Sequence, residues 1–206
     1  MANRVIIYID GLNFYNGLRD AGWKKYYWLD LPAFFSKLIK PHQILQGVSY
    51  FSCIPFQKER QDRQAQLFLA NKLDPRFTVH FGALYRKRIS CNKCQFVTST
   101  FVEKESDVRL ASHMISDVVN NKCDVSILVS GDRDFLPTIE TIKGLKPTHK
   151  IFTFFPPHRT SGYLKRVSDR YVDLGLHEQK FASSLLPHQI LNSPNNIPIL
   201  RPQKWS

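Results

Sequence analysis

Residues 124–140 read DVSILVSGDRDFLPTIE, a stretch that changes character at its middle. Its first part, residues 125–129, is mostly apolar and rich in β-branched side chains, as expected for a central parallel strand covered on both faces. Its last part leads into residues 135–145, where apolar residues recur at helical spacing. A short polar turn separates the two parts. The stretch therefore predicts a strand, a turn and a helix, which is the repeating unit of an α/β fold.

The start of the chain repeats this pattern. Residues 5–9 form a second apolar run with several β-branched residues, and Asp10 and Gly11 stop it. The spacing after the stop predicts a helix from about Asn13. The apolar run is too short for a signal-peptide core or a membrane span, so we expect no membrane partner and a cytoplasmic location.

The rest of the chain alternates in the same way. Apolar spacing predicts helices over residues 31–39, 58–73, 107–119 and 161–167. Short apolar runs predict strands over residues 48–53, 77–84, 151–155 and 171–174. Such alternation specifies a doubly wound α/β sandwich. We therefore expect one domain over residues 1–184, with helices on both faces of a central, mostly parallel sheet.

Two segments depart from this rhythm. Residues 85–103 are basic, contain a CxxC pair and alternate like a hairpin, so they predict a projecting β-ribbon. Residues 185–206 are interrupted by prolines and predict a C-terminal tail without a regular helix. Apolar side chains of the tail are expected to hold it against the domain: Ile197, Ile199 and Trp205.

The charge balance indicates the kind of binding partner, and the cysteine pattern indicates the redox state of the compartment. The 206 residues include 29 Lys and Arg against 17 Asp and Glu, which gives a net charge of +12 and a pI near 9.7. Such a balance favours a polyanionic partner, with nucleic acid the first candidate. The four cysteines do not form the pattern of a disulfide framework, which fits a reducing compartment.

Aspartates gather at one kind of place in the predicted fold. Asp10 follows the first strand, Asp107 opens a helix, and Asp132 and Asp134 follow the strand of residues 125–129. In open α/β sheets, ligands bind beyond the carboxyl ends of the strands, where the strand order switches direction. Carboxylates crowded there favour a hard cation, Mg²⁺ or Mn²⁺. Each aspartate alone fits a turn or a helix N-cap, but the four together predict metal-dependent phosphodiester hydrolysis.

Three segments carry a resemblance to a known family. IIYIDGLNFYNGL (residues 6–18), VEKESDVRLASHMISD (residues 102–117) and residues 124–140 resemble the NYN domain family, the LabA-like branch of the PIN-like nucleases. The resemblance covers nearly the whole chain, including the CxxC segment and the closing RPQKW. It implies a PIN-like three-layer α/β sandwich and a Mg²⁺ or Mn²⁺ site used to cleave RNA.

The resemblance assigns residues to that site. The family's aspartate after the first strand matches Asp10, its asparagine three residues later matches Asn13, and its helix-opening aspartate matches Asp107. The family's SGDxDF motif matches Ser130, Gly131, Asp132, Asp134 and Phe135. Some nucleases of the wider class carry paired acids where this chain has Ser106 and Asp107. Either Glu105 takes the place of the second acid at longer reach, or the site holds one tight metal ion and a second only with substrate bound.

Chemistry suggests a role for each of these residues. Asp10, Asp107 and Asp132 are the expected ligands of the Mg²⁺ or Mn²⁺ ion, directly or through water. Asp134 completes the shell or orients a water, and Asn13 holds a water or a substrate phosphate. A second interpretation of Asn13 is a simple N-cap of the first helix.

Basic and aromatic side chains supply candidate RNA contacts. The expected phosphate contacts are Arg86, Lys87, Arg88, Lys93, Lys104, Arg133, Lys165, Arg166 and Arg170. Because phosphate contacts read no sequence, we expect weak sequence specificity. Aromatic residues after the first strand either stack unpaired bases or pack in the core: Tyr15, Trp23, Tyr26, Tyr27 and Trp28.

The CxxC pair, Cys91 and Cys94, resembles one half of a zinc ribbon. No second CxxC or His pair lies nearby in the sequence. A Zn²⁺ site would therefore need distant ligands such as Cys53 or His80, or a partner chain. Two free thiols in a tight turn are the interpretation that we favour over zinc.

The sequence as a whole predicts a cytoplasmic ribonuclease that depends on Mg²⁺ or Mn²⁺ and acts on single-stranded or structured RNA. A rival from another class is an RNA-binding regulator that keeps the fold but turns over little or nothing. A phosphatase with a carboxylate nucleophile is more distant, because Leu12 stands where such enzymes place a second aspartate. The sequence leaves open a homodimer and the choice between internal and terminal cleavage.

Overall fold

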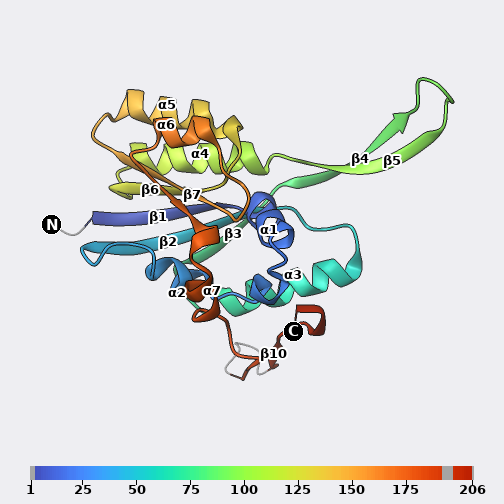
Figure 1. The fold of residues 1–206 in the computed structure, drawn as a ribbon, viewed down its shortest axis with the longest axis horizontal. Helices are drawn as coiled ribbons and strands as arrows, with labels where there is room; N and C mark the ends of the chain where they lie inside the picture. The colour runs from blue at the N-terminus through green and yellow to red at the C-terminus, as the bar shows by residue number, and fades with distance from the viewer. Residues whose placement is uncertain (1–2, 192–196, 206) are drawn as a thin grey trace.

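A six-stranded sheet forms the centre of the computed structural model, which describes residues 3–191 and 197–205. All neighbouring strands in this sheet are parallel, in the order β3-β2-β1-β6-β7-β8 (Figure 1). The strands are β1 Asn3–Asp10, β2 Gln43–Ser52, β3 Phe77–Phe81, β6 Val125–Val129, β7 Lys150–Phe155 and β8 Arg170–Asp173. The predicted α/β fold with a central parallel sheet is confirmed.

The strand order changes direction once. From β1 the chain builds outward through β2 to β3, and then returns to the other side of β1 with β6 and builds outward to β8. The carboxyl ends of β1 and β6 therefore flank the switch point, where open α/β sheets bind their ligands.

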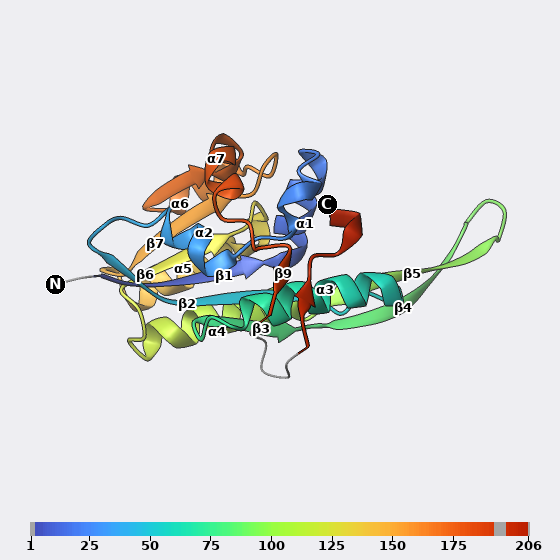
Figure 2. The ribbon, with the colours of Figure 1, turned by 90° about the horizontal axis from the view of Figure 1, so that it is seen from below.

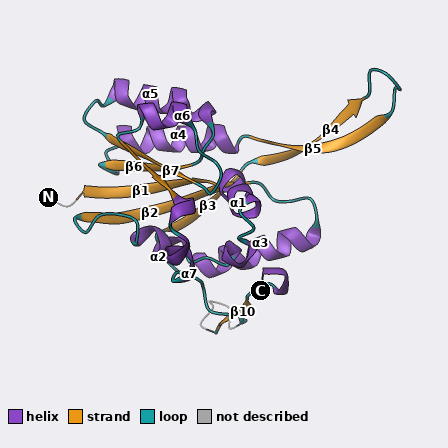
Figure 3. Ribbon diagram, in the orientation of Figure 1, coloured by secondary structure: helices purple, strands orange, loops and turns teal. Residues whose placement is uncertain are grey.

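Helices cover both faces of the sheet (Figures 1, 2 and 3). One face carries α4 Ser106–Val119, α5 Leu136–Leu145 and α6 Gly162–Val167. The other carries α1 Gly11–Asp20, α2 Leu31–Ser36, α3 Lys58–Asn71 and α7 Glu178–Ala182. Short 3-10 turns link these elements: η1 Lys24–Tyr27, η2 Arg133–Phe135 and η3 Leu174–Leu176. A further 3-10 turn, η4 Gln203–Trp205, lies in the tail. The result is the predicted three-layer sandwich.

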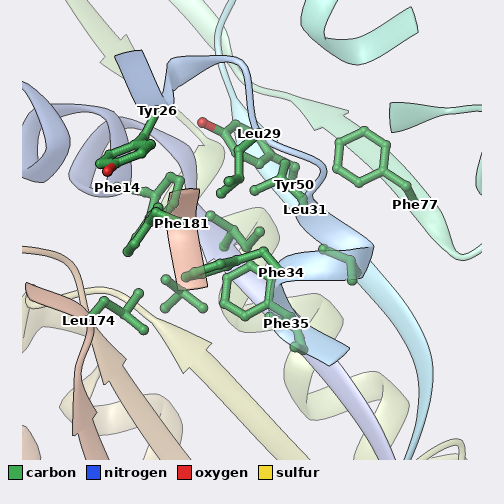
Figure 4. Packing of buried hydrophobic residues seen from close by; sticks show 14 of the residues in the cluster. Phe14, Tyr26, Leu29, Leu31, Phe34, Phe35, Tyr50, Phe77, Leu174 and Phe181 are labelled. Atoms are coloured by element: carbon green, nitrogen blue, oxygen red, sulfur yellow. The ribbon is translucent and has the colours of Figure 1, made fainter. Parts of the chain in front are cut away.

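Two cores follow from the alternation of side chains along β1. Ile7 and Ile9 point into a cluster rich in aromatic rings, whereas Tyr8 points into a smaller cluster under α4 and α5. In the aromatic cluster the rings of Phe34 and Phe181 lie 4.2 Å apart between their centroids (Figure 4). Because both faces of β1 are buried, its sequence reads as a continuous apolar run rather than an alternating one.

Two predicted elements end three residues earlier than expected. The helix predicted for residues 31–39 ends at Ser36. The strand predicted for residues 77–84 is broken at Gly82, whose backbone N–H donates to the Ser52 carbonyl at 2.8 Å. A Cβ at Gly82 would lie 2.6 Å from the carbonyl oxygen of Lys104, so only glycine allows this close approach. The chain leaves the sheet at this point and enters the ribbon.

The predicted ribbon is present and projects from the domain. It consists of β4 Ala83–Ser90 and β5 Val97–Lys104, an antiparallel pair. These strands extend one or two residues beyond the predicted range of 85–103. In Figure 1 the ribbon extends past the edge of the sheet at which β1 ends. Residues 85–101 are exposed along their whole length.

The tail lies against the domain, as predicted. Its short strands β9 Gln189–Ile190 and β10 Ile199–Leu200 pair antiparallel. Ile199 and Trp205 are buried, whereas Ile197 is exposed. The indole N–H of Trp28 donates to the Pro187 carbonyl at 2.8 Å. Pro194, one of the prolines that interrupt the tail sequence, lies outside the described residues. None of the helices in the described ranges is long and apolar enough to cross a membrane.

Candidate functional site

Asp10 occupies the switch point of the sheet. It ends β1 and is the N-cap of α1, because its Oδ1 accepts a hydrogen bond from the Asn13 backbone N–H at 3.0 Å. Its Oδ2 accepts from the Ser130 hydroxyl, directly after β6, at 2.9 Å. The carboxylate therefore joins the two strands at which the sheet order reverses. The second interpretation of Asn13, as the N-cap, does not hold, because Asp10 occupies that position.

Asn13 and Ser130 hold the loop after β6 in place. The Gly131 N–H donates to the Asn13 side-chain oxygen, and the Asp132 N–H donates to the Ser130 hydroxyl, both at 3.0 Å. Asp132 caps the next turn by accepting from the Asp134 N–H at 3.0 Å. Each predicted member of the SGDxD motif is thus tied to β1, to α1 or to its neighbour. This network fixes the direction of the Asp132 carboxylate.

Burial and neighbouring charge make Asp10 an unusual carboxyl group. Burial raises its pKa most, and its two hydrogen bonds lower the pKa by less. The charges of Asp107 and Asp132 raise the pKa further, and the result is a pKa of about 7 against an ordinary value of 3.8. Asp107 and Asp132 therefore lie within electrostatic reach of Asp10.

Asp107 extends this acidic group, which we call the acidic centre: Asp10, Asp107, Asp132 and Asp134. Desolvation raises the pKa of Asp107 most, followed by the charges of Glu103, Asp132 and Asp134. Glu103 was missed from the sequence, although its position in β5 places it on the same strand face as Phe101. Glu105, the expected substitute for a second acid, instead accepts from Arg109 and Tyr85.

The acidic centre suits a hydrated divalent cation better than a closed protein cage. Among residues 3–191 and 197–205, no three Asp, Glu, His or Cys side chains are placed to hold a metal ion together. Mg²⁺ commonly keeps several waters and needs only one or two carboxylates. Every donor here is a hard oxygen, and each oxygen of Asp10 accepts a single hydrogen bond. The residues therefore fit Mg²⁺ or Mn²⁺ held partly through water.

The raised pKa predicts how stability changes with pH in the Asp10→Asn variant. Because the folded-state pKa of Asp10 is about 7 and its ordinary value is 3.8, the native protein binds this proton more tightly than the unfolded chain. The group therefore stabilises the fold at low pH, and this contribution is lost as the pH rises through 7. Asparagine carries no charge at any pH.

We expect Asp10→Asn to be more stable than the wild type at pH 8 by roughly 1–3 kcal/mol, and the difference to shrink by pH 5. Thermal melts in EDTA at both pH values provide the measurement. If the variant and the wild type differed in stability by the same amount at pH 5 and pH 8, the raised pKa of Asp10 would be contradicted.

The predicted RNA contacts fall into two groups. The ribbon carries Arg86, Lys87, Arg88, Lys93 and Lys104, all exposed. The second group lies around Tyr163 in α6, whose ring contacts the guanidinium groups of Arg133 and Arg166 at 5.4 and 4.7 Å. The Lys165 ammonium lies over the Tyr171 ring at 5.2 Å. Arg133 directly follows Asp132, so this group reaches the acidic centre.

The aromatic candidates divide between core and surface. Tyr26, Tyr27 and Trp28 are buried, whereas Tyr15 is 39% exposed. Trp23 packs edge-on against Tyr26 at 5.5 Å. Of these five side chains, Tyr15 is the most exposed and is therefore the candidate for stacking on a base.

The CxxC pair lies at the tip of the ribbon. Both thiols are exposed, and all four cysteines are free. Cys53 belongs to the loop after β2, and His80 belongs to β3, where its ring stacks on Phe51. In the described part of the chain neither joins the CxxC pair in a group of three candidate ligands. Zn²⁺ binding at the tip therefore stays a prediction. It would require further ligands from a partner chain.

Comparison with known proteins identifies the family. The model of the NYN domain matches residues 4–176. The chain belongs to the NYN domain family. This match confirms the resemblance found in the sequence, and the parallel sheet with its flanking helices is consistent with a PIN-like NYN fold.

A curated relative and a solved structure are also similar. The chain is 25% identical to 6-hydroxy-3-succinoylpyridine 3-monooxygenase HspA of Pseudomonas putida (strain DSM 28022 / S16), over 98% of this chain and 75% of that protein. A protein of unknown function from Vibrio parahaemolyticus RIMD 2210633 matches with a TM-score of 0.56 and 19% identity, over 83% of this chain and 92% of that one. The second likeness shows the fold alone.

Proposed function

We propose that this NYN domain protein is a ribonuclease that depends on Mg²⁺ or Mn²⁺. One arrangement carries the proposal: Asp10, at the end of β1, accepts from Ser130, directly after β6, at the switch point. Burial raises the pKa of Asp10 most, and the charges of Asp107 and Asp132, from two other elements, raise it further. A buried carboxylate among other carboxylates is stable as an anion when a cation neutralises it.

The basic surface supports RNA as the substrate. The ribbon strands and their turn, residues 83–104, contain five basic residues and one acidic residue. Arg133 and Arg166 add positive charge beside the acidic centre. A phosphate backbone could then run from the ribbon to the carboxylates, with the basic side chains offsetting its charge. This arrangement explains how an anionic substrate approaches an acidic site.

The chain's own residues have distinct roles in this proposal. A bound divalent cation would supply a water of lowered pKa and would stabilise charge on the phosphate oxygens. Asp10, Asp107 and Asp132 would hold it, directly or through water. Ser130 and Asn13 orient the carboxylate of Asp10 and the loop that carries Asp132. Asp134, exposed beside Asp132, would orient a water or the leaving group.

The direct test uses purified protein and end-labelled RNA, one single-stranded and one structured, with Mn²⁺, Mg²⁺ or EDTA. We expect products with either metal and none with EDTA. Tight RNA binding without products under any metal would remove the nuclease proposal and leave the RNA-binding regulator.

The ribbon should supply much of the RNA affinity. We expect the triple variant Arg86→Ala, Lys87→Ala, Arg88→Ala to bind single-stranded RNA at least about 10-fold more weakly. Each phosphate contact releases counterions, so the slope of log affinity against log salt should become shallower by about 2. Binding titrations at several salt concentrations measure both quantities.

Lys150→Ala is the matched control. Lys150 is the first residue of β7, so it lies at the amino ends of the parallel strands, opposite the carboxyl ends that carry the acidic centre. Its slope should equal that of the wild type. A triple variant with an unchanged slope would show that the ribbon does not contact phosphates.

A second candidate function is oxygenation of a small aromatic compound. The relative from Pseudomonas putida is named as a monooxygenase of a hydroxylated pyridine. One observation favours this candidate: an apolar cavity of about 490 Å³ lies beside the acidic centre. Incubation with 6-hydroxy-3-succinoylpyridine, a reduced nicotinamide and O₂ tests it. Substrate-dependent uptake of O₂ would support oxygenation, and its absence would count against this candidate.

A further inference from the structure

The cavity of about 490 Å³ lies between α1, α3 and the base of the ribbon. Its walls include Gly11 and Tyr15 of α1, Arg60 and Arg63 of α3, and Trp205 of the tail. The volume falls within the roughly 300–1,000 Å³ of small-molecule sites, and a mostly apolar lining with few polar groups is typical of them.

The cavity adjoins the acidic centre. Gly11 directly follows Asp10, and the Tyr50 hydroxyl, also in the cavity wall, donates to the Gly11 carbonyl at 3.2 Å. Glu103 lines the cavity at the ribbon base, and its charge raises the pKa of Asp107. A group in the cavity would therefore lie next to a phosphate held at the acidic centre.

Flat aromatic surfaces form part of the wall. Phe56 is 68% exposed and stacks on Phe101 with ring centroids 4.4 Å apart and planes 21° apart. Tyr15 lies against Tyr27 with ring centroids 4.8 Å apart. Exposed ring faces of this kind bind planar heterocycles by stacking, whatever the base.

One polar group in the wall has an unmet hydrogen bond. Glu103 Oε1 is buried and has no partner among the described residues. That oxygen has no surface open to the cavity, so a ligand there meets the other carboxylate oxygen of Glu103. It too accepts no hydrogen bond from the described residues, so it favours a ligand that carries an N–H group. The amino groups of adenine, cytosine and guanine supply such a donor. Uracil offers only its N3–H, which lies between two carbonyl oxygens that would face the carboxylate and repel it.

Positive charge lies at the same wall. Arg60 and Arg63 point from α3, and within the described residues neither forms an ion pair. Guanidinium groups bind phosphate in a forked geometry. An occupant that combines a flat ring, an amino group and flanking phosphates therefore matches this cavity better than an apolar ligand does.

We propose that the cavity holds an unpaired, amino-bearing nucleobase of the RNA strand, one that flanks the phosphate at the acidic centre. The choice of RNA rests on the proposed nuclease function. Phe56 and Tyr15 stack on the base, Glu103 accepts from its amino group, and Arg60 and Arg63 contact the adjoining backbone. Because a paired base cannot enter, the RNA must be single-stranded beside the cut.

The experiment first measures binding without chemistry. Adenosine 5′-monophosphate, uridine 5′-monophosphate, free adenine and ribose 5-phosphate are titrated into the full protein in EDTA. We expect the adenine nucleotide to bind best, and ribose 5-phosphate at least roughly 5-fold more weakly because it lacks a base to stack. Phe56→Ala should weaken binding of the adenine nucleotide roughly 5-fold to 100-fold.

Phe96→Ala is the matched control, because Phe96 is 67% exposed but lies near the ribbon tip, outside the cavity wall. The Phe96→Ala variant should bind adenosine 5′-monophosphate with the affinity of the wild type. Equal binding of adenosine 5′-monophosphate and ribose 5-phosphate would overturn the proposal. So would a Phe56→Ala variant that melts normally and binds the adenine nucleotide as the wild type does.

Three further outcomes separate this inference from a small-molecule pocket and from the nuclease proposal. Free adenine binding as tightly as the nucleotide would overturn the RNA assignment and indicate a pocket for small heterocycles. An RNA with one abasic nucleotide beside the cut should be cleaved more slowly than the intact RNA in Mn²⁺, and equal rates would overturn the inference while the nuclease stands. Base-dependent binding of nucleotide, with no cleavage of any RNA, would support the cavity and remove the nuclease.

Discussion

Asp132→Asn is expected to slow RNA cleavage at least about 100-fold while changing RNA affinity by less than about threefold. The asparagine keeps nearly the same shape and can still accept from the Asp134 N–H, so the loop should keep its fold. The lost negative charge weakens cation binding, and the cation acts on charge that develops in the transition state. The basic ribbon, which binds the substrate, is unchanged. Single-turnover rates with Mn²⁺ and equilibrium binding in EDTA measure the two effects.

Asp124→Asn is the matched control at the opposite end of β6. Asp124 forms an ion pair with Arg4 at 2.9 Å, and its hydrogen bonds with Arg4 lower its pKa to about 2. Its neutralisation should reduce stability modestly near neutral pH and leave the cleavage rate unchanged. Equal rates for the wild type and Asp132→Asn would exclude the acidic centre as the site of cleavage.

Gly131→Ala is expected to destabilise the protein by about 3 kcal/mol or more, or to prevent folding. A Cβ at this position would lie 1.8 Å from the Arg159 carbonyl oxygen, a backbone atom that cannot move aside cheaply. If the variant folds, the loop after β6 must shift, so Ser130 and Asp132 move relative to Asp10. Chemical denaturation measures the loss, and cleavage should fall with it.

Gly144→Ala tests whether the effect belongs to that contact. Gly144 is an exposed residue of α5, and a Cβ there would meet no atom within 4 Å. Alanine should stabilise the helix by up to about 1 kcal/mol. A Gly131→Ala variant as stable as Gly144→Ala would mean that the close approach to Arg159 is not present in solution.

The sheet could be predicted because its signals are local. The strands at residues 5–9 and 125–129 are buried on both faces. Strands of this kind consist mostly of consecutive apolar residues, which can be recognised in the sequence. The ends of these strands carry Asp10 and Ser130, so their approach follows once the strands are taken as neighbours. The positions of the four aspartates also indicated a metal site, and the resemblance to the NYN domain family added Asn13, Ser130 and RNA as the expected substrate.

The features that could not be predicted depend on contacts between distant segments. Gly82 breaks the expected strand because the backbone of Lys104 approaches it, and no local pattern reports that contact. Glu103 was not singled out from the sequence, because its place at the cavity wall depends on how β5 is positioned. The cavity itself draws on α1, α3, the ribbon and the tail, which are far apart in the sequence. For the same reason, the sequence suggested a water, a phosphate or the helix N-cap as the partner of Asn13, and not the Gly131 N–H that it binds.

The position of β1 in the middle of the sheet has a consequence for how the chain folds during synthesis. One edge of β1 pairs with β2, whereas the other waits for β6, whose first residue pairs with Val5 from 120 positions later in the chain. Until that segment leaves the ribosome, the open edge exposes unpaired backbone groups to other chains. Parallel pairing over such a distance is intrinsically slow, because the chain must close a long loop before the contact forms. The nascent protein therefore has its longest vulnerable period before β6 docks, and the contact between Asp10 and Ser130 can form only after that period ends.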